Sequence, residues 1–371
     1  MKKSVKKNNG SRIVFYTREG EGQAGFEIRS HDLSIELLKH GIHSHIVSFK
    51  DFHKNKSEQE ISLFKKFVIN IKVFFKIRKF KPQILILQRV NYHFIAALVY
   101  KLLFRPKLIL DVDDWEIREN IKNYFWGISN SFADNLTRFL ASIADIVVVS
   151  STYLEEYLIP YAKKIVKIPS GICKEQFKRN IDGKSYLRCV WNGSLECGRE
   201  ETFDDMVKLV KIFSEKANSD LKLLIIARGN LVDKLNELIK KLDNSSIQLI
   251  KNCPRKDVSQ LLSSCHIGLL PLFHSSKFYQ AKSPVKLFEY MATGLIVVAS
   301  NQGEVMHILK DGESGFLVSS HQEMIDRINL ISRQDPNDSM NLAHNAYSLY
   351  QADFSLEGVS HIWQKILGDL R

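Results

Sequence analysis

The chain has 371 residues, of which 44% are hydrophobic and 25% are charged, a length that suits about two domains with full cores. No run of about 18 uncharged apolar residues occurs, and the lysine-rich start lacks the apolar core of a signal peptide, so we expect a cytoplasmic protein without a membrane-spanning helix. Five cysteines without CxxC spacing indicate free thiols rather than a disulfide framework or a zinc site.

The net charge of +12 belongs entirely to the first half of the chain. Residues 1–180 carry 31 Lys and Arg against 18 Asp and Glu, whereas residues 181–371 carry 22 against 23. Such asymmetry indicates that the first half has an anionic partner, either a membrane surface or a nucleic acid. The lysines lack the context of known RNA- or DNA-binding motifs, so a nucleic-acid partner is not expected.

The first buried strand is predicted at residues 12–17, with a helix ending near residue 41 and a strand over residues 43–49. Three glycines, Gly20, Gly22 and Gly25, separate that first strand from its helix. They would let the backbone approach a ligand closely. Their spacing is not the GxGxxG of a dinucleotide-binding loop, so the pattern predicts a close approach and no particular ligand.

Residues 61–81 combine apolar residues at helical spacing with dense positive charge. The apolar set is Phe64, Phe67, Val68, Ile71, Phe74, Phe75 and Phe80, and the cations are Lys65, Lys66, Lys72, Lys76, Arg78, Lys79 and Lys81. One interpretation is a basic helix whose exposed phenylalanines lie on anionic lipid. The other is a helix whose phenylalanines face a sheet and whose lysines are solvated.

An acidic cluster follows the strand predicted at residues 107–110, after a strand at 83–87, Gln88-Arg89 and a helix at 92–104. Its carboxylates belong to Asp111, Asp113 and Asp114. A DxD at a strand end could hold a divalent cation through carboxylate oxygens. It could also cap a helix.

Strands and helices alternate through the rest of the chain, which predicts parallel, doubly wound sheets. A helix at 131–142 and strands at 144–151 and 164–168 complete the first domain. A polar linker is expected at 174–185. The next strand ends in Asn192-Gly193-Ser194, with Arg199 a few residues later.

The stretch from Lys282 to Val318 is the most informative one. Ser283-Pro284 begins a helix, since proline is tolerated in the first turn, and Thr293-Gly294 ends it before a buried strand at 295–300. A helix start offers N–H groups and a positive dipole end, and Lys282 and Lys286 lie close by. The local chemistry suits a phosphate or diphosphate, and Glu289 could accept hydrogen bonds from sugar hydroxyls.

This stretch resembles the C-terminal signature of the retaining glycosyltransferases of family 4. The resemblance implies the α/β GT-B fold, in which two Rossmann-like domains face a central cleft. In that family a Glu, seven residues and a second Glu contact the sugar nucleotide. Glu289 matches the second Glu, which binds the ribose, and the first falls on Ala281.

The resemblance also implies roles for individual residues. In the family a Gly-Arg pair and a later Lys hold the donor diphosphate; Gly193 matches the Gly, Ser194 replaces the Arg, and Arg199 takes the place of the Lys. The full implied set is, for donor binding, Gly193, Ser194, Arg199, Arg228, Ser283, Pro284, Val285, Lys286 and Glu289; for catalysis, Asp113, Asp114 and Lys282; and for the acceptor side of the cleft, Gly22, Gly25 and Arg89. Lys277, Tyr279 and Gln280 are expected near the sugar. No metal and no cofactor are expected, the nucleotide sugar being a substrate.

The resemblance divides the chain into an acceptor-binding domain (1–180), a nucleotide-sugar-binding domain (181–350) and a closing helix (351–371), anchored by Trp363, that packs back on the first domain. We expect a hexosyltransferase that acts on a glycan or lipid-linked acceptor in surface polysaccharide synthesis (lipopolysaccharide, capsule or exopolysaccharide), peripheral on the inner face of the cytoplasmic membrane. The alternative is a catalytically decayed GT-B protein that acts as a binding or regulatory subunit, since Ala281 and Ser194 replace two expected contacts.

Overall fold

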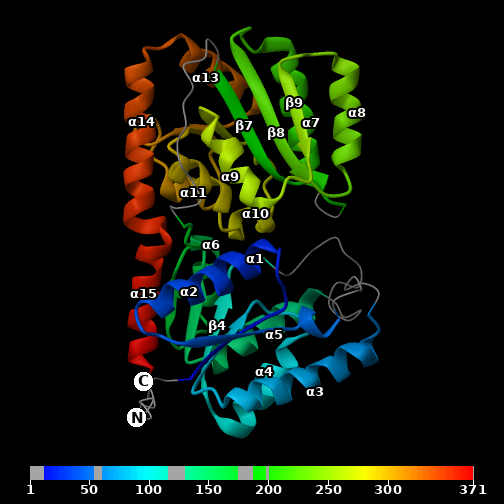
Figure 1. Cartoon of the computed structure of the whole chain (residues 1–371), viewed down its shortest axis with the longest axis vertical. Helices are drawn as coiled ribbons and strands as arrows, with labels where there is room; N and C mark the ends of the chain where they lie inside the picture. The colour runs from blue at the N-terminus through cyan, green and yellow to red at the C-terminus, as the bar shows by residue number, and fades with distance from the viewer. Residues whose placement is uncertain (1–11, 54–60, 116–129, 174–186, 198–199, 371) are drawn as a thin grey trace, which may run out of the picture. The chain divides into compact units, whose positions relative to one another are not determined.

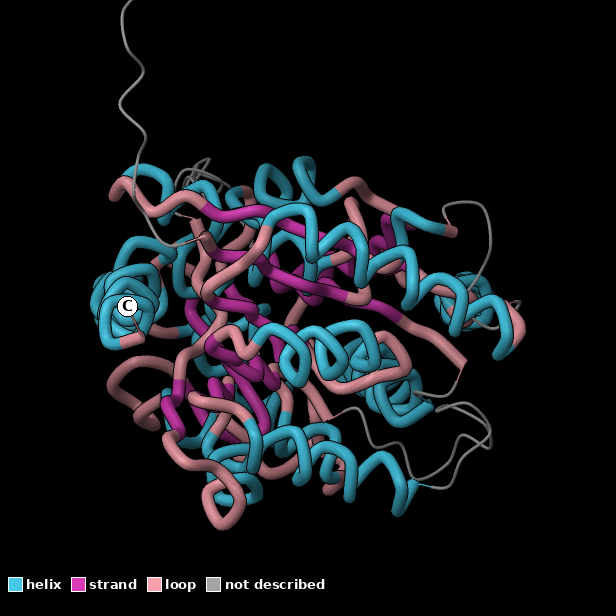
Figure 2. The backbone as a smooth tube through the Cα atoms, turned by 90° about the horizontal axis from the view of Figure 1, so that it is seen from below, coloured by secondary structure: helices cyan, strands magenta, loops and turns pink. Residues whose placement is uncertain are grey.

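The computed structural model describes residues 12–53, 61–115, 130–173, 187–197 and 200–370, which form two compact units (Figure 1). The first unit comprises Met1–Ser150, Leu154–Gly171 and Val359–Arg371, and the second comprises Ser151–Tyr153 and Ile172–Gly358. Each unit holds one parallel six-stranded sheet, with its strands lying among helices (Figure 2). The linker expected at residues 174–185 lies outside the described residues.

The sheet of the first unit has the strand order β2-β1-β3-β4-β5-β6. Its strands are β1 (Ile13–Thr17), β2 (Ser44–Ser48), β3 (Ile84–Gln88), β4 (Lys107–Val112), β5 (Ile146–Val149) and β6 (Ile165–Lys167). The central strands β1, β3, β4 and β5 are apolar along almost their whole length because both faces of the sheet are covered.

The helical segments of the first unit include a π-helical turn between its first two helices. They are α1 (Ala24–Phe26), η1 (Glu27–Asp32), α2 (Leu33–Lys39), η2 (Lys50–Phe52), α3 (Leu63–Phe80), α4 (Phe94–Phe104), α5 (Asn130–Ile143) and, crossing the unit boundaries, α6 (Thr152–Leu158) and α15 (Leu356–Asp369). Helices α3 and α4 both end on a left-handed residue, Lys81 and Arg105, followed at once by a proline. These are ordinary helix stops.

The closing helix α15 contributes to the core of the first unit. Trp363 is buried, and its ring centroid lies 6.2 Å from that of Phe15 in β1. Lys164 also forms an ion pair of 2.9 Å with Asp369, near the end of α15. The last turns of the chain are therefore part of the same unit as its first strand.

The sheet of the second unit has the order β12-β11-β10-β7-β8-β9. Its strands are β7 (Leu187–Ser194), β8 (Leu221–Arg228), β9 (Ile247–Lys251), β10 (Ile267–Leu270), β11 (Ile296–Ser300) and β12 (Phe316–Val318), and its helices are α7 (Glu200–Lys216), α8 (Val232–Leu242), α9 (Arg255–Ser263), α10 (Lys277–Ala281), α11 (Val285–Thr293), α12 (Val305–Ile308), α13 (His321–Arg333), α14 (Pro336–Leu349) and the π-helical η5 (Tyr350–Phe354). Apolar residues of α7, α8 and α13 share one core with β7, β8, β10 and β11.

The strand order of each sheet shows at which edge a ligand would bind. In doubly wound sheets, ligands bind outside the carboxyl ends of the strands where the strand order reverses. That switch point lies between β1 and β3 in the first unit and between β7 and β10 in the second. The candidate donor and acceptor sites lie at these two edges.

The structure decides one open alternative and corrects one expected loop. The exposed side of α3 carries Phe64, Phe67 and Phe75, so these phenylalanines do not face the sheet, whereas Lys66 is buried with its ammonium 4.5 Å from the ring centroid of Tyr92. The reason is that Ile69, Val73 and Ile77 already fill the buried side. The loop expected at residues 273–281 contains the short helix α10, whose first turn is capped by Ser276. Within the described residues, no helix is both long enough and apolar enough to cross a membrane.

Candidate functional site

The carboxyl ends of β7 and β8 bring three of the predicted donor-site residues together in the second unit. Gly193 and Ser194 are the last two residues of β7, and Ser194 pairs with Arg228, the last residue of β8. The Nε of Arg228 donates a hydrogen bond of 3.0 Å to the Oγ of Ser194. A guanidinium is thereby held beside the switch point of this sheet.

Lys286, in the first turn of α11, reaches the same strand end. Its Nζ lies 4.4 Å from the ring centroid of Trp191, a favourable position for a cation over an aromatic face. A Cβ added to Gly193 would lie 2.3 Å from that Nζ and 2.8 Å from the Trp191 ring. Glycine at position 193 therefore leaves the space that the ammonium occupies.

Glu289 lies one turn further along α11 and is buried, with 8% of its surface exposed. The Nδ2 of Asn192 donates a hydrogen bond of 2.9 Å to its Oε2. Burial raises the pKa of Glu289, and the Asn192 hydrogen bond and the charges of Arg255, Lys286 and Arg228 oppose that rise. The carboxylate thus lies within electrostatic reach of three cations.

Glu289→Gln is expected to raise the melting temperature of the ligand-free protein at pH 7 by a few degrees. A carboxyl whose folded pKa is raised above the unfolded value of about 4.3 destabilises the fold at high pH, and this cost disappears as the pH falls below the unfolded value. Glutamine keeps the shape and the acceptor for Asn192 without the buried charge. Thermal unfolding of both proteins from pH 8 to pH 4 should show the difference shrinking as the pH falls; a difference that grows instead contradicts the assignment of cause.

The start of α11 is formed by the predicted stretch from Lys282 to Val285. Pro284 is the residue before the helix, and no side chain caps this end. Ser283 is buried, and the Nζ of Lys282 lies 5.0 Å from the ring centroid of Phe278. The helix therefore begins beside two lysines, an environment that favours an anion.

In the first unit, the predicted acceptor-side residues Gly25 and Arg89 meet at the switch point between β1 and β3. Arg89 donates from Nε and Nη2 to the two oxygens of Asp113, at 2.5 and 2.9 Å, and from Nη1 to Oε1 of Glu19 at 2.7 Å. A Cβ on Gly25 would lie 2.4 Å from the Glu19 carboxylate, so the glycine makes room for this network. Gly22 has a φ of +83° and donates its N–H to Oε1 of Glu27.

The DxD carboxylates are engaged by arginines. Asp111 is buried and accepts from Nε and Nη2 of Arg29, at 3.0 and 2.5 Å, and Asp113 accepts from Arg89 in the same bidentate way. Burial raises the pKa of Asp111, and its contact with Arg29 opposes this rise. Asp114 accepts from the backbone N–H of Trp115, and the segment it might cap lies outside the described residues. These pairings favour an ion-pair role over the metal-binding alternative.

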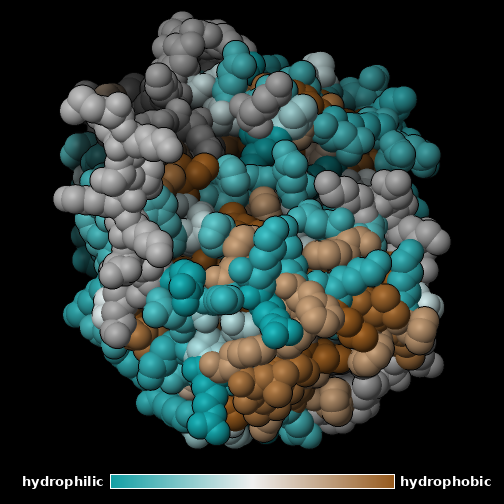
Figure 3. Space-filling model, turned by 60° about the horizontal axis from the view of Figure 1, so that its bottom comes forward, coloured by the Kyte–Doolittle hydropathy of each residue, from teal (hydrophilic) through white to brown (hydrophobic). Residues whose placement is uncertain are grey.

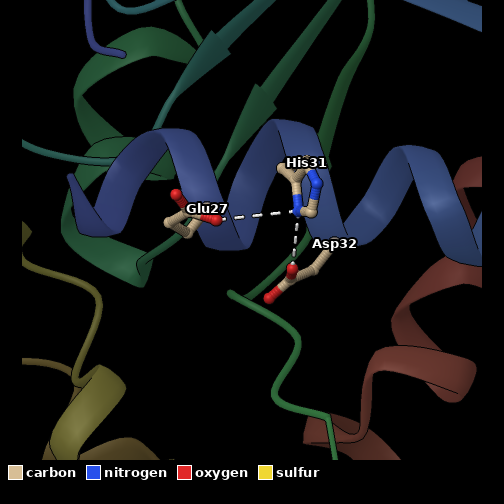
Figure 4. A group of neighbouring side chains, drawn as sticks. All are labelled: Glu27, His31 and Asp32. Carbon is tan, nitrogen blue, oxygen red and sulfur yellow. Dashed lines mark hydrogen bonds and ion pairs between the residues drawn. The ribbon is translucent and has the colours of Figure 1, made fainter. Parts of the chain in front are cut away.

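Glu27, His31 and Asp32 form a separate group on η1 (Figure 4). Their ligand-type atoms lie within 4.8 Å of one another. The Nδ1 of His31 lies 3.6 Å from the Glu27 carboxylate and 3.1 Å from that of Asp32, so the three side chains pair among themselves on an exposed helical surface. This mutual pairing accounts for the arrangement.

The structure adds residues that the sequence patterns did not indicate and displaces others. Asn192, Arg255 and Glu19 were not predicted, although Arg255 begins the helix after β9 at the functional edge, a placement that could have identified it. Tyr279 is buried, and its hydroxyl lies 2.7 Å from that of Thr202, so it is part of the packing of α10 rather than an open sugar contact. Arg199 lies outside the described residues.

A comparison with known protein families finds a match for the part of the chain that contains the donor-site residues. Residues 196–349, all within the second unit, match the family model described as "Glycosyl transferases group 1". This part of the chain is therefore similar to a group 1 glycosyl transferase domain. This domain contains α11 with Lys286 and Glu289, and it begins two residues after Ser194. No curated protein matches the sequence.

Solved structures extend the likeness beyond the group 1 domain to almost the whole chain. Sucrose-phosphate synthase from Thermosynechococcus elongatus is 15% identical with a TM-score of 0.76, covering 97% of this chain and 99% of that one. A glycosyltransferase from Rickettsia africae is 16% identical with a TM-score of 0.74, covering 98% and 99%. Anabaena HepE, solved in complex with UDP and glucose, is 14% identical with a TM-score of 0.72, covering 97% and 100%. These likenesses and the two parallel sheets confirm the predicted GT-B fold class.

Proposed function

We propose that the protein transfers a hexosyl group from a nucleoside diphosphate sugar to a glycan or lipid-linked acceptor in the synthesis of lipopolysaccharide, capsule or exopolysaccharide. The observation that carries the proposal lies at the carboxyl end of β7. There Asn192 donates a hydrogen bond to the buried Glu289, Gly193 leaves space for the Lys286 ammonium, and Ser194 accepts a hydrogen bond from Arg228. Cations at this edge suit a diphosphate, and a buried carboxylate suits hydroxyl donors.

Each donor-site residue has a role that follows from its chemistry. Lys286 and Arg228, with Arg199, stabilise the negative charge that grows on the departing diphosphate, while Lys282 stands beside the reacting sugar. Glu289 accepts hydrogen bonds from the ribose hydroxyls. Gly193 leaves space for the Lys286 ammonium, and Ser194 holds Arg228 by a hydrogen bond. The start of α11, formed by Ser283, Pro284 and Val285, supplies backbone dipoles.

The first unit supplies the acceptor side in this proposal. The Arg89 guanidinium, fixed by Asp113 and Glu19, lies beside Gly25 in the glycine loop that also contains Gly22. Asp114 follows β4 at the same edge of the sheet. We assign the enzyme to the retaining transferases of family 4, acting without a metal or cofactor and peripherally on the inner face of the cytoplasmic membrane. The UDP named in the HepE complexes supports a nucleotide donor.

The alternative of a decayed binding or regulatory subunit rested on Ala281 and Ser194. It is not favoured, because the arginine missing at position 194 has a counterpart in Arg228, whose guanidinium is bonded to Ser194. A thermal-shift screen of nucleotide sugars, followed by measurement of nucleotide release with a glycan acceptor, separates the two. Binding of a nucleotide sugar without turnover on any acceptor would support the alternative of a decayed subunit.

Gly193→Ala is expected to weaken binding of the nucleoside diphosphate by about tenfold, equivalent to about 1.4 kcal/mol, because a methyl group takes the place of the Lys286 ammonium. Calorimetric titration measures the affinity. Gly368→Ala is the matched control, since its added Cβ meets no atom within 4 Å. Equal affinities in both variants would show that Lys286 does not depend on this space.

A further inference from the structure

Helices α3 and α4 present nine large apolar side chains to solvent. This apolar face consists of Leu63, Phe64, Phe67, Ile71 and Phe75 of α3 and Val99, Leu102, Leu103 and Phe104 of α4. The most exposed are Phe64 at 77%, Leu102 at 67% and Leu103 at 64%. Ring contacts of Phe74 with Tyr100 and Phe104, at 6.1 and 6.2 Å, join the two helices. Figure 3 turns this end of the molecule forward and shows the brown, apolar atoms gathered there.

A hollow of about 500 Å³ opens beside the apolar face, at the amino edge of the sheet. Five cations line this basic hollow: Arg12, Arg78, Lys81, Arg105 and Lys107. Tyr100 and Phe104 are also among its lining residues, so Phe104 belongs both to the hollow and to the apolar face. The two features therefore form one continuous surface of the first unit.

The cations of the basic hollow have few acidic partners. Lys107 lies 3.6 Å from Asp145, whereas no carboxylate among the described residues forms an ion pair with Arg12, Arg78, Lys81 or Arg105. The guanidinium of Arg78 lies 5.6 Å from the ring centroid of Phe104. Burial raises the pKa of the Tyr100 phenol, and the charges of Arg12 and Arg78 oppose this rise, which places both guanidiniums within electrostatic reach of one hydroxyl.

The segment that contains α3 and α4 carries charge of one sign only. Between residues 61 and 110 there are eleven Lys and Arg residues and no Asp or Glu. Helix C-termini carry partial negative charge, and α3 and α4 both end at the hollow, so part of this positive charge offsets their dipoles. The four cations other than Lys107 carry more positive charge than the two helix ends carry negative charge, so the hollow can still bind an anion.

We propose that the apolar face enters the acyl region of an anionic lipid bilayer while the basic hollow binds a lipid headgroup phosphate. Contiguous exposed apolar patches mark protein or membrane contacts, and the charge decides between these two. A second copy of the chain would bring two sets of these cations together, which opposes a dimer through this face. Anionic lipid satisfies the cations and the apolar side chains at once.

The test is cosedimentation with vesicles of phosphatidylcholine alone or with 30 mol% phosphatidylglycerol, a fraction of about one third that supplies the negative surface. The parent should bind the mixed vesicles at least tenfold more tightly. The triple variant Arg78→Gln, Lys81→Asn, Arg105→Asn should lose about a hundredfold, since each cation contributes about fivefold. Asparagine suits positions 81 and 105 because both have positive φ.

Matched controls come from the second unit. The charge control is the triple variant Lys208→Gln, Lys211→Gln, Lys240→Gln. It removes the same charge from exposed positions of α7 and α8, and its vesicle affinity should stay within about twofold of the parent.

The apolar face is tested separately with the triple variant Phe64→Gln, Leu102→Gln, Leu103→Gln, which should abolish vesicle binding. Its control, Met306→Gln, Leu330→Gln, Met340→Gln, changes exposed apolar residues of the second unit and should leave vesicle binding unchanged. Thermal unfolding checks each fold, and the single Arg105→Asn, with about fivefold loss expected, replaces the triple variant if that one melts early.

Three outcomes overturn the proposal: a parent that ignores mixed vesicles, equal losses in the basic-hollow variant and its charge control, or a concentration-dependent dimer that the apolar variant dissolves. This inference rests on the peripheral membrane location given under the proposed function, and it names the surface that makes the contact. Nucleotide binding is measured on the same variants and should not change, since the donor site belongs to the other unit. Failure of nucleotide binding with vesicle binding intact would therefore count against the transfer reaction alone.

Discussion

Lys286→Met is expected to lower kcat by about 10²- to 10³-fold, the usual loss when one preorganised group that stabilises developing negative charge is removed. Methionine keeps the length of the side chain and its packing on Trp191, so the fold should persist. Release of the nucleoside diphosphate under saturating donor measures the effect. Lys240→Gln on the exposed side of α8 serves as the charge control.

Combining Lys286→Met with Arg228→Gln separates a shared site from two independent ones. Both cations act on the environment of Glu289 and lie at neighbouring strand and helix ends. If they stabilise the same diphosphate, the double variant should lose less than the product of the two single losses, because groups that act as a unit are not additive. Strictly multiplicative losses would place Arg228 outside the site.

Glu289→Ala is expected to weaken donor binding by about 10- to 150-fold, as for loss of hydrogen bonds to a charged group worth about 1.5 to 3 kcal/mol. Glu289 also contributes to the packing of the second unit, because it is buried and accepts a hydrogen bond from Asn192. Alanine would leave the Asn192 amide without this acceptor, so part of any loss is structural.

Glu289→Gln resolves that ambiguity. It keeps an acceptor for Asn192 and should fold at least as well as the parent, yet it loses the charge that strengthens bonds to ribose hydroxyls. We expect donor affinity between those of the parent and the alanine variant. A glutamine variant with parental affinity would remove Glu289 from the list of donor contacts.

The parts of the donor site that the sequence predicted are those encoded by local patterns. Pro284 and Gly294 delimit α11 as expected, and the run after Gly294 becomes β11. Gly193 falls at the end of β7, where the sheet order reverses. Short-range turn chemistry and strand ends therefore sufficed to locate Lys286 and Glu289 on the functional edge.

Contacts between distant segments were not accessible in the same way. Asn192 and Glu289 are 97 residues apart, and Arg89 and Glu19 are 70 apart, so no local spacing links them. The orientation of α3 was also undecided, because phenylalanine is apolar enough for either side; Ile69, Val73 and Ile77 settle it by filling the buried side. Tyr279 was expected near the sugar, but its hydroxyl contacts that of Thr202, a residue 77 positions away in the sequence.

Calorimetric titration of nucleotide sugars into the parent, Lys286→Met and Glu289→Gln tests the central claim most directly. We predict saturable binding of at least one UDP or GDP sugar to the parent with a Kd below about 1 mM, and weaker binding to both variants. Absence of heat with every nucleotide sugar at millimolar concentration, or equal affinity in all three proteins, would contradict it.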